Sequence, residues 1–196
     1  MSEESALSFR KLVSAMRTTE TEYWAHRDKK MLRQSIELEK RVDDIILKAD
    51  GSAVPQNDNG TFFLLVAELR ASTIQYFQEK KKAQPDKELV NTLFNTIKEK
   101  EAKLDKMLIR LQDEQIKKDG YSIHYQVMER LPRAHQARPV FSSMDEQLAK
   151  VELDDLYRHP DPPGTMYFIC KKYLGKDGKP LTEEEVDKII NNNLNS

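Results

Sequence analysis

Apolar residues in the first half of the chain recur at intervals of three and four positions. Over residues 9–24, FRKLVSAMRTTETEYW, they are Phe9, Leu12, Val13, Met16 and Tyr23. Residues 62–77, FFLLVAELRASTIQYF, repeat the spacing with Phe62, Leu65, Val66, Leu69 and Tyr76. Apolar residues spaced in this way lie on one face of an α-helix. The pattern therefore predicts two amphipathic helices with matching core faces.

The two segments also match at positions that the apolar spacing does not require. These repeated residues are Arg17, Tyr23, Trp24, Arg70, Tyr76 and Phe77. We expect them to have structural roles: the aromatic pairs close the end of a core near a turn, and the arginines lie beside them or pair with Asp43 and Asp105. Stacking of the rings on nucleic-acid bases is the alternative.

A further helix is expected after each segment. Asp28 and Asp86 stand at charged turns as helix N-caps, and apolar stripes follow both. Matching residues of the two copies stand 53 positions apart in the first helix of each hairpin and 62 apart late in the second. The last four inserted residues make about one helical turn, so the apolar residues stay on one face of the helix. Residues 1–118 are therefore predicted to form two tandem helical hairpins that resemble a four-helix bundle, with a long fourth helix that continues to Ile116.

The remaining residues have a different pattern. Residues 119–142 are predicted to form an extended, Pro-rich arm or linker: YSIHYQVM alternates in polarity, as a short strand or an arm would, and Pro132 and Pro139 follow it. Residues 143–196 are predicted to be a small helical element with capping boxes at Ser143 and Thr182, although MYFICKKYLG fits a helix or a strand equally well. The expected fold class is mainly α.

Composition narrows the function classes. The 196 residues include 32 Lys and Arg and 33 Asp and Glu, and this balance gives no general argument for nucleic acid or an anionic membrane as a partner. The longest apolar run, FFLLVA, is far shorter than a membrane span, and the N-terminal residues do not have the pattern of a secretory signal. A single cysteine, Cys170, fits a reducing compartment. We expect a soluble, cytoplasmic protein with no membrane partner.

Candidate catalytic and metal sites are weak. The chain has no Gly-rich phosphate loop, and its four histidines do not have metal-ligand spacing. A calcium loop around Gly178 fails because Tyr173 and Gly175 would occupy ligand positions. Arg130 and His135 form the R-x-x-x-x-H signature of certain helical ribonucleases, but Pro132 interrupts it. We therefore expect no catalytic, cofactor-binding or metal-binding residues, and no enzyme.

Basic residues concentrate in two places. Lysines of the second hairpin alternate with acidic residues, as on a solvated helix face: Lys80, Lys81, Lys82, Lys98, Lys100, Lys103 and Lys106. The second place, RLPRAHQARPVF, has no acidic residue and is the predicted partner-binding segment. Its candidate contact residues are Arg130, Arg133, His135, Arg138 and Phe141.

One motif carries a resemblance. The pattern F-x-x-L-V-x-x-M-R-x5-Y-W-x-x-R spans Phe9 to Arg27, and L-x-x-S-x-x-L-E-x-x-V-D follows from Leu32 to Asp43. It resembles a group of uncharacterised small helical proteins of gut bacterial genomes, mobile elements and phages. Those proteins usually have Phe where this chain has Trp24. The resemblance covers about forty residues strongly, the second copy weakly and residues 119–196 not at all, and it implies a helical hairpin and a genomic context.

These observations predict a noncatalytic structural or assembly protein that acts through protein–protein contacts or self-association. In the context that the resemblance implies, it would be a phage virion, connector or mobile-element component, in the bacterial cytoplasm or within a virion. The alternative is a nucleic-acid-binding accessory protein that uses the lysines of the second hairpin and the arginines of the arm.

Overall fold

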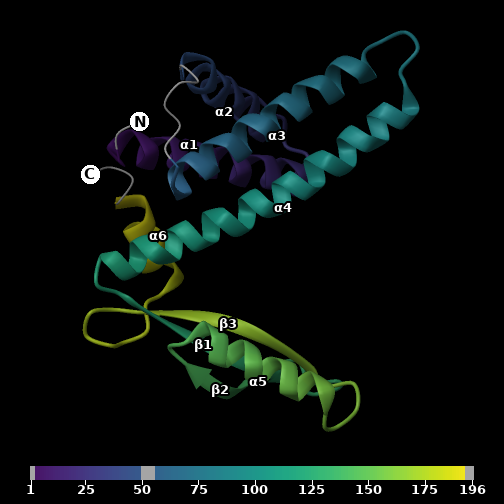
Figure 1. The fold of residues 1–196 in the computed structure, drawn as a ribbon. Coiled ribbons are helices and arrows are strands. Elements are labelled where there is room, and N and C mark those ends of the chain that lie inside the picture. The colour runs from purple at the N-terminus through teal and green to yellow at the C-terminus, as the bar shows by residue number, and fades with distance from the viewer. Residues whose placement is uncertain (1–2, 50–55, 193–196) are drawn as a thin grey trace. The chain divides into compact units, whose positions relative to one another are not determined.

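The structure, a computed structural model, describes residues 3–49 and 56–192. It divides into two compact units, residues 1–111 and 112–196. The described residues are mainly helical, which confirms the predicted class, and they also include a small antiparallel sheet (Figure 1). Among the helices of the described ranges, none is long and apolar enough to span a membrane.

Four helices build the first unit. They are α1 (Glu3–His26), α2 (Lys29–Lys48), α3 (Asp58–Lys80) and α4 (Lys87–Lys118), whose last turns belong to the second unit. Short polar side chains begin three of them: the carboxylate of Asp28 accepts a hydrogen bond from Lys30 N, Asn57 accepts one from Gly60 N, and Asp86 accepts two at the start of α4. Residues 50–55 of the predicted connection between the hairpins lie outside the described residues.

The matching apolar faces meet in one core. All four helices contribute buried residues: Phe9, Val13, Met16, Leu38, Val42, Phe62, Phe63, Val66, Leu69, Ile97, Leu104 and Leu111. The ring of Phe9 on α1 lies 6.1 Å from that of Phe62 and 5.2 Å from that of Phe63, both on α3. Burial of each such side chain contributes about 1.5–3 kcal/mol. The first unit is therefore held by contacts between the two repeats as well as within them.

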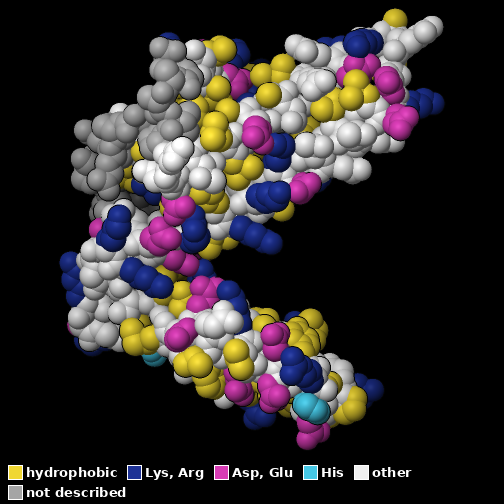
Figure 2. All heavy atoms as spheres, in the orientation of Figure 1, with side chains coloured by type: hydrophobic (Ala, Val, Ile, Leu, Met, Phe, Trp, Pro, Cys, Tyr) yellow, Lys and Arg dark blue, Asp and Glu magenta, His cyan; other side chains and the backbone are white. Residues whose placement is uncertain are grey.

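The surface of the first unit alternates in charge. Four of the lysines of α3, α4 and their connection form ion pairs with nearby glutamates: Lys82 with Glu79, Lys98 with Glu101, Lys100 with Glu68 and Lys103 with Glu99. Figure 2 shows dark blue and magenta side chains interspersed over this unit. This is the pattern of a solvated helix face rather than of a continuous basic surface for phosphates.

The second unit contains a three-stranded antiparallel sheet. Its strands, β1 (Ser122–Arg130), β2 (Arg138–Ser143) and β3 (Met166–Leu174), have the order β2–β1–β3, and α5 (Glu146–Arg158) contacts all three. Figure 1 shows α5 lying along the sheet, and α6 (Glu183–Asn192) follows β3 in the chain. The buried residues of β1 alternate from Ile123 to Glu129. Since successive strand residues point to opposite faces, one face of β1 meets the core.

The strand that the alternation of residues 121–127 allowed is present as β1, whereas the extended arm predicted over residues 119–142 is not, because much of this segment is paired sheet. Strand β1 pairs along its whole length with β3, and β2 pairs with its other edge. Pro139 is tolerated because β2 is an edge strand and the register shifts at this point, between the pairs Val127–Phe141 and Met128–Pro139. The predicted helical element over residues 143–196 likewise contains a strand, β3, as well as α5 and α6.

Candidate functional site

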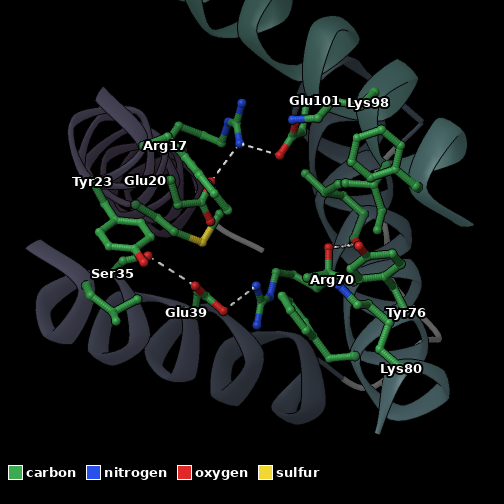
Figure 3. A pocket seen from close by; sticks show the side chains of 18 residues that line it. Arg17, Glu20, Tyr23, Ser35, Glu39, Arg70, Tyr76, Lys80, Lys98 and Glu101 are labelled. Atoms are coloured by element: carbon green, nitrogen blue, oxygen red, sulfur yellow. Dashed lines mark hydrogen bonds and ion pairs between the residues drawn. The ribbon is translucent and has the colours of Figure 1, made fainter. Parts of the chain in front are cut away.

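A cavity of about 380 Å³ lies in the first unit, where side chains from all four helices converge (Figure 3). All six residues of the repeated set line it: Arg17, Tyr23, Trp24, Arg70, Tyr76 and Phe77. The remaining lining residues include Glu20, Ser35, Glu39, Phe94, Lys98 and Glu101. The internal repeat therefore places two copies of the same residue set around one space.

Arg17 joins α1 to α4. Its Nε and Nη2 donate to the two carboxylate oxygens of Asp105 at 2.9 and 3.0 Å, and its Nη1 donates to Glu101 Oε1 at 3.0 Å. The side chain of Arg17 is only 12% exposed. A bidentate arginine–carboxylate pair fixes both the distance and the orientation of its groups. These bonds therefore set the position of α1 against α4.

Arg70 makes the corresponding contacts between α3 and α2. Its Nε and Nη2 donate to the two oxygens of Asp43 at 2.8 and 2.9 Å, and its Nη1 donates to Glu39 Oε2 at 2.8 Å. Ser35 Oγ donates in turn to Glu39 Oε1 at 3.1 Å. The side chain of Arg70 is 8% exposed, so these charges are largely removed from water.

The ion pairs of the two arginines cross from one repeat to the other. Each one pairs with the acidic residues of the other hairpin, and those acids, Glu39 with Asp43 and Glu101 with Asp105, stand 62 positions apart in the chain. The expected pairing of the arginines with Asp43 and Asp105 is present, and the pairs cross from one hairpin to the other. The cavity is consequently bounded by two equivalent ion-pair networks.

The carboxylates perturb the titration of the groups around them. Burial alone would lower the pKa of both guanidinium groups, but the hydrogen bond of Arg17 with Asp105, that of Arg70 with Asp43 and the neighbouring glutamates outweigh burial and raise it. Both arginines therefore stay charged at any pH at which the protein is folded.

Glu20 breaks the equivalence of the two networks. It accepts a hydrogen bond from Arg17 Nη1 at 2.6 Å, whereas the matching position of the second repeat is Thr73. Burial raises the pKa of Glu20; the charge of Arg17 lowers it, and repulsion from Glu39 and Glu101 raises it further. The cavity thus contains one carboxylate more than the repeat requires.

Aromatic rings form the rim of the cavity. Trp24, Phe77 and Phe94 are 60%, 51% and 46% exposed, and the ring of Tyr76 lies 5.3 Å from that of Phe77 and 6.3 Å from that of Phe94. Tyr76 packs against the core, which fits the expectation that the aromatic pairs close its end. Trp24 and Phe77 instead face solvent. Together with Phe94 they give the rim an exposed apolar surface, and such a patch, rather than a single exposed residue, marks an interaction site.

Cations of the chain itself lie over several of these rings. The guanidinium of Arg27 is 4.1 Å from the centroid of the Trp24 ring, Lys80 Nζ is 5.2 Å from that of Tyr76, and Lys98 Nζ is 5.8 Å from that of Phe94. These distances are within the range of cation–π attraction.

The predicted partner-binding residues lie in the second unit, around the turn between β1 and β2. Arg130 ends β1 and contacts Met166 Sδ, Arg133 and His135 lie in the turn, and Arg138 begins β2 and pairs with Glu129 at 2.7 Å. Phe141 is partly buried against the core instead of ending a free arm. The structure thus keeps four of these residues, Arg130, Arg133, His135 and Arg138, in or beside one turn, and their role in partner binding stays a prediction.

A polar cluster that sequence analysis missed lies in the second unit. The buried carboxylate of Asp113 accepts hydrogen bonds from Lys171 and, at 3.1 Å, from the hydroxyl of Tyr173. Burial and the charge of Asp113 raise the pKa of Tyr173, and burial with the nearby Glu146 raises that of Tyr125 to about 12. Only the approach of α4 to β3 brings these residues together, so no local signal announces them.

No family model, curated protein or solved structure matches this chain. Within the described ranges, no three His, Cys, Asp or Glu side chains are grouped closely enough to hold a metal ion. The cavity with its aromatic rim and crossed ion pairs is the most developed candidate site of the first unit.

Proposed function

We propose that the protein is a noncatalytic structural or assembly protein and that it binds a protein partner at the aromatic rim of the cavity. The observation that carries this proposal is the exposure of Trp24, Phe77 and Phe94 around a cavity whose charged walls are held by ion pairs. Aromatic residues on a rigid support are enriched at the centres of protein–protein interfaces.

The charged residues of the cavity support binding more than chemistry. All three side-chain nitrogens of Arg17 and of Arg70 donate hydrogen bonds to carboxylates, and these bonds hold the carboxylates in place. A catalytic acid or base must instead reach the reacting group and exchange a proton with it. The ion pairs hold the helices that carry the rim residues against one another, and a preorganised surface loses less entropy when a partner binds.

The partner is a second copy of this chain or another protein. The resemblance of residues 9–43 to proteins of bacterial mobile elements and phages supports a role in a virion, a connector or a mobile-element assembly within a bacterial host. Nucleic-acid binding has less support, since Lys82, Lys98, Lys100 and Lys103 already pair with glutamates.

Site-specific photo-crosslinking tests the proposal. The photoreactive residue p-benzoylphenylalanine replaces Phe77 at the rim or, as a matched control, Leu47, an exposed apolar residue of α2 that does not line the cavity. After irradiation in the cells that make the protein, we expect a discrete crosslinked protein from position 77 and none from position 47. Sedimentation of the purified chain then shows whether that partner is a second copy.

Equal crosslinking from both positions, or none from position 77 together with a monomeric chain in sedimentation, would overturn the proposal.

A further inference from the structure

The charges on the cavity wall differ in whether they have partners. The wall contains the carboxylates Glu20, Glu39 and Glu101 and the cations Arg17, Arg70, Lys80 and Lys98. Each carboxylate is ion-paired with one of the two arginines, and Lys98 pairs with a carboxylate as well. Lys80 forms no ion pair within the described residues, and its Nζ lies 5.2 Å from the centroid of the Tyr76 ring (Figure 3). An incoming anion therefore meets a free cation, whereas an incoming cation must compete for carboxylates that are already paired.

A second free cation lies at the rim. The guanidinium of Arg27 is 4.1 Å from the centroid of the Trp24 ring, and no carboxylate of the described ranges pairs with it. The adjacent carboxylate, that of Asp28, instead accepts a hydrogen bond from Lys30 N at the start of α2. Arg27 has a φ of 56°, in the left-handed region where glycine usually follows a helix. The chain therefore carries a charged side chain beside the rim at a position where glycine would be less strained.

Many apolar side chains line the cavity beside these two cations. Those below the rim include Met16, Leu32, Leu69 and Ile97. The volume of about 380 Å³ is in the size range of ordinary ligand sites. A guest that has an apolar side chain beside carboxylates would use both features, because burial of the apolar group and pairing with Arg27 and Lys80 would act together.

A protein segment fits these observations better than a nucleic acid does. A phosphate backbone is bound by cations that follow it along a groove. The two free cations instead lie at a single cavity, and lysines of α4 and of its connection to α3 pair with glutamates. The charges thus suit a short anionic segment rather than a long anionic strand.

We infer that the partner protein presents an apolar side chain flanked by acidic residues, with the apolar group in the cavity and the carboxylates paired with Arg27 and Lys80. The inference rests on the proposed function and names the chemistry of the partner. A cationic segment would be repelled by both of these residues, and a neutral segment would leave them unpaired.

Capped tripeptides test the inference on the purified full chain. Ac-Glu-Leu-Glu-NH2, Ac-Gln-Leu-Gln-NH2 and Ac-Lys-Leu-Lys-NH2 share the apolar residue and differ in the flanking charges, and Ac-Glu-Gly-Glu-NH2 lacks the apolar side chain. Trp24 is the single tryptophan of the chain and lines the cavity, so its fluorescence reports binding. We expect the acidic leucine peptide to bind about tenfold more tightly than the glutamine peptide, which is about threefold for each of two exposed ion pairs. The lysine peptide should bind most weakly, and the glycine peptide about tenfold more weakly than its leucine counterpart.

Four variants assign the effect to the two cations. Arg27→Gln and Lys80→Gln are each expected to weaken binding of the acidic leucine peptide about threefold. Arg27→Lys keeps the charge and should retain most of the affinity. Lys106→Gln makes the same change of charge at an exposed residue of α4 that does not line the cavity, and it should leave binding unchanged. Added salt should reduce the advantage of the acidic peptide over the glutamine peptide.

The inference is overturned if the glutamine or lysine peptide binds as tightly as the acidic leucine peptide, or if folded protein that carries both Arg27→Gln and Lys80→Gln binds it like the wild type. Tighter binding of a short oligothymidylate, or equal binding of glutarate, would overturn the assignment of the guest to a protein chain. Crosslinking from position 77 without an acidic preference would reject the inference and leave the proposed function standing. An acidic preference without any crosslinked partner or self-association would reject the proposed function instead.

Discussion

Replacement of Arg70 by methionine removes the cation that joins α3 to α2 while it keeps most of the side-chain stem. The change eliminates three charge-assisted hydrogen bonds, of 2.8, 2.9 and 2.8 Å, and leaves Asp43 and Glu39 without their arginine. Removal of one member of a buried ion pair costs about 3–5 kcal/mol. Since the side chains of Asp43 and Glu39 are each 25% exposed and reach water, we expect about 3 kcal/mol for Arg70→Met.

Urea unfolding followed by Trp24 fluorescence measures this loss, because the only tryptophan lies in the first unit. Arg70→Lys should recover only part of the stability, since an ammonium cannot form the bidentate pair with Asp43. Lys103→Met is the control: it breaks an exposed pair with Glu99 and should leave the unfolding midpoint unchanged. A loss below about 1 kcal/mol in Arg70→Met would refute the reasoning, because the network would then be no stronger than a surface pair.

Three further predictions concern single side chains. Burial raises the pKa of Glu20 in the folded state, so the free energy of unfolding of the wild type falls as pH rises from about 4.5 through that raised pKa. Glu20→Gln removes the ionisable group and should therefore be the more stable protein at pH 7. Urea unfolding at a series of pH values should show that this difference in stability disappears in acid. Phe141→Ala should cost about 2 kcal/mol and speed hydrogen exchange in β1, whereas unchanged exchange would mean that Phe141 does not pack there. Asp113→Asn should lower the pKa of Tyr173 in an ultraviolet absorbance titration, and an unchanged pKa would contradict the contact.

The helices of the first unit were predictable because their signals are local. Apolar spacing located the core faces of α1 and α3, and the short side chains of Asp28 and Asp86 marked the starts of α2 and α4. The repeated arginines and aromatic residues were also visible in the sequence. Whether Arg17 pairs with Asp43 of its own hairpin or with Asp105 of the other was not, since that choice depends on how the two hairpins pack.

The sheet was harder to predict because strand pairing is nonlocal. Alternation over residues 121–127 indicated a strand or an arm, and only pairing with β2 and β3 decides between them. Pro139 argued against a regular element, but a bulge on an edge strand tolerates it. The apolar residues of Met166–Leu174 fit the spacing of a helix as well as that of a strand, and its nine residue pairs with β1 make it a strand. Glu20 was missed as a cavity residue because its neighbours Glu39 and Glu101 come from other helices.

The two hairpins are joined by Arg17, which pairs with Asp105, and by Arg70, which pairs with Asp43, and these pairs bound one cavity. A pair of double-mutant cycles tests this arrangement most directly, with Arg17→Met combined once with Asp105→Asn and once with Asp43→Asn. The crossed pair should show a coupling energy of about 1 kcal/mol, a value that allows for the exposure of Asp105, and the pair within one hairpin should show none. Coupling of Arg17 with Asp43 instead would mean that each hairpin closes on itself, and it would contradict the cavity and the binding proposed for it.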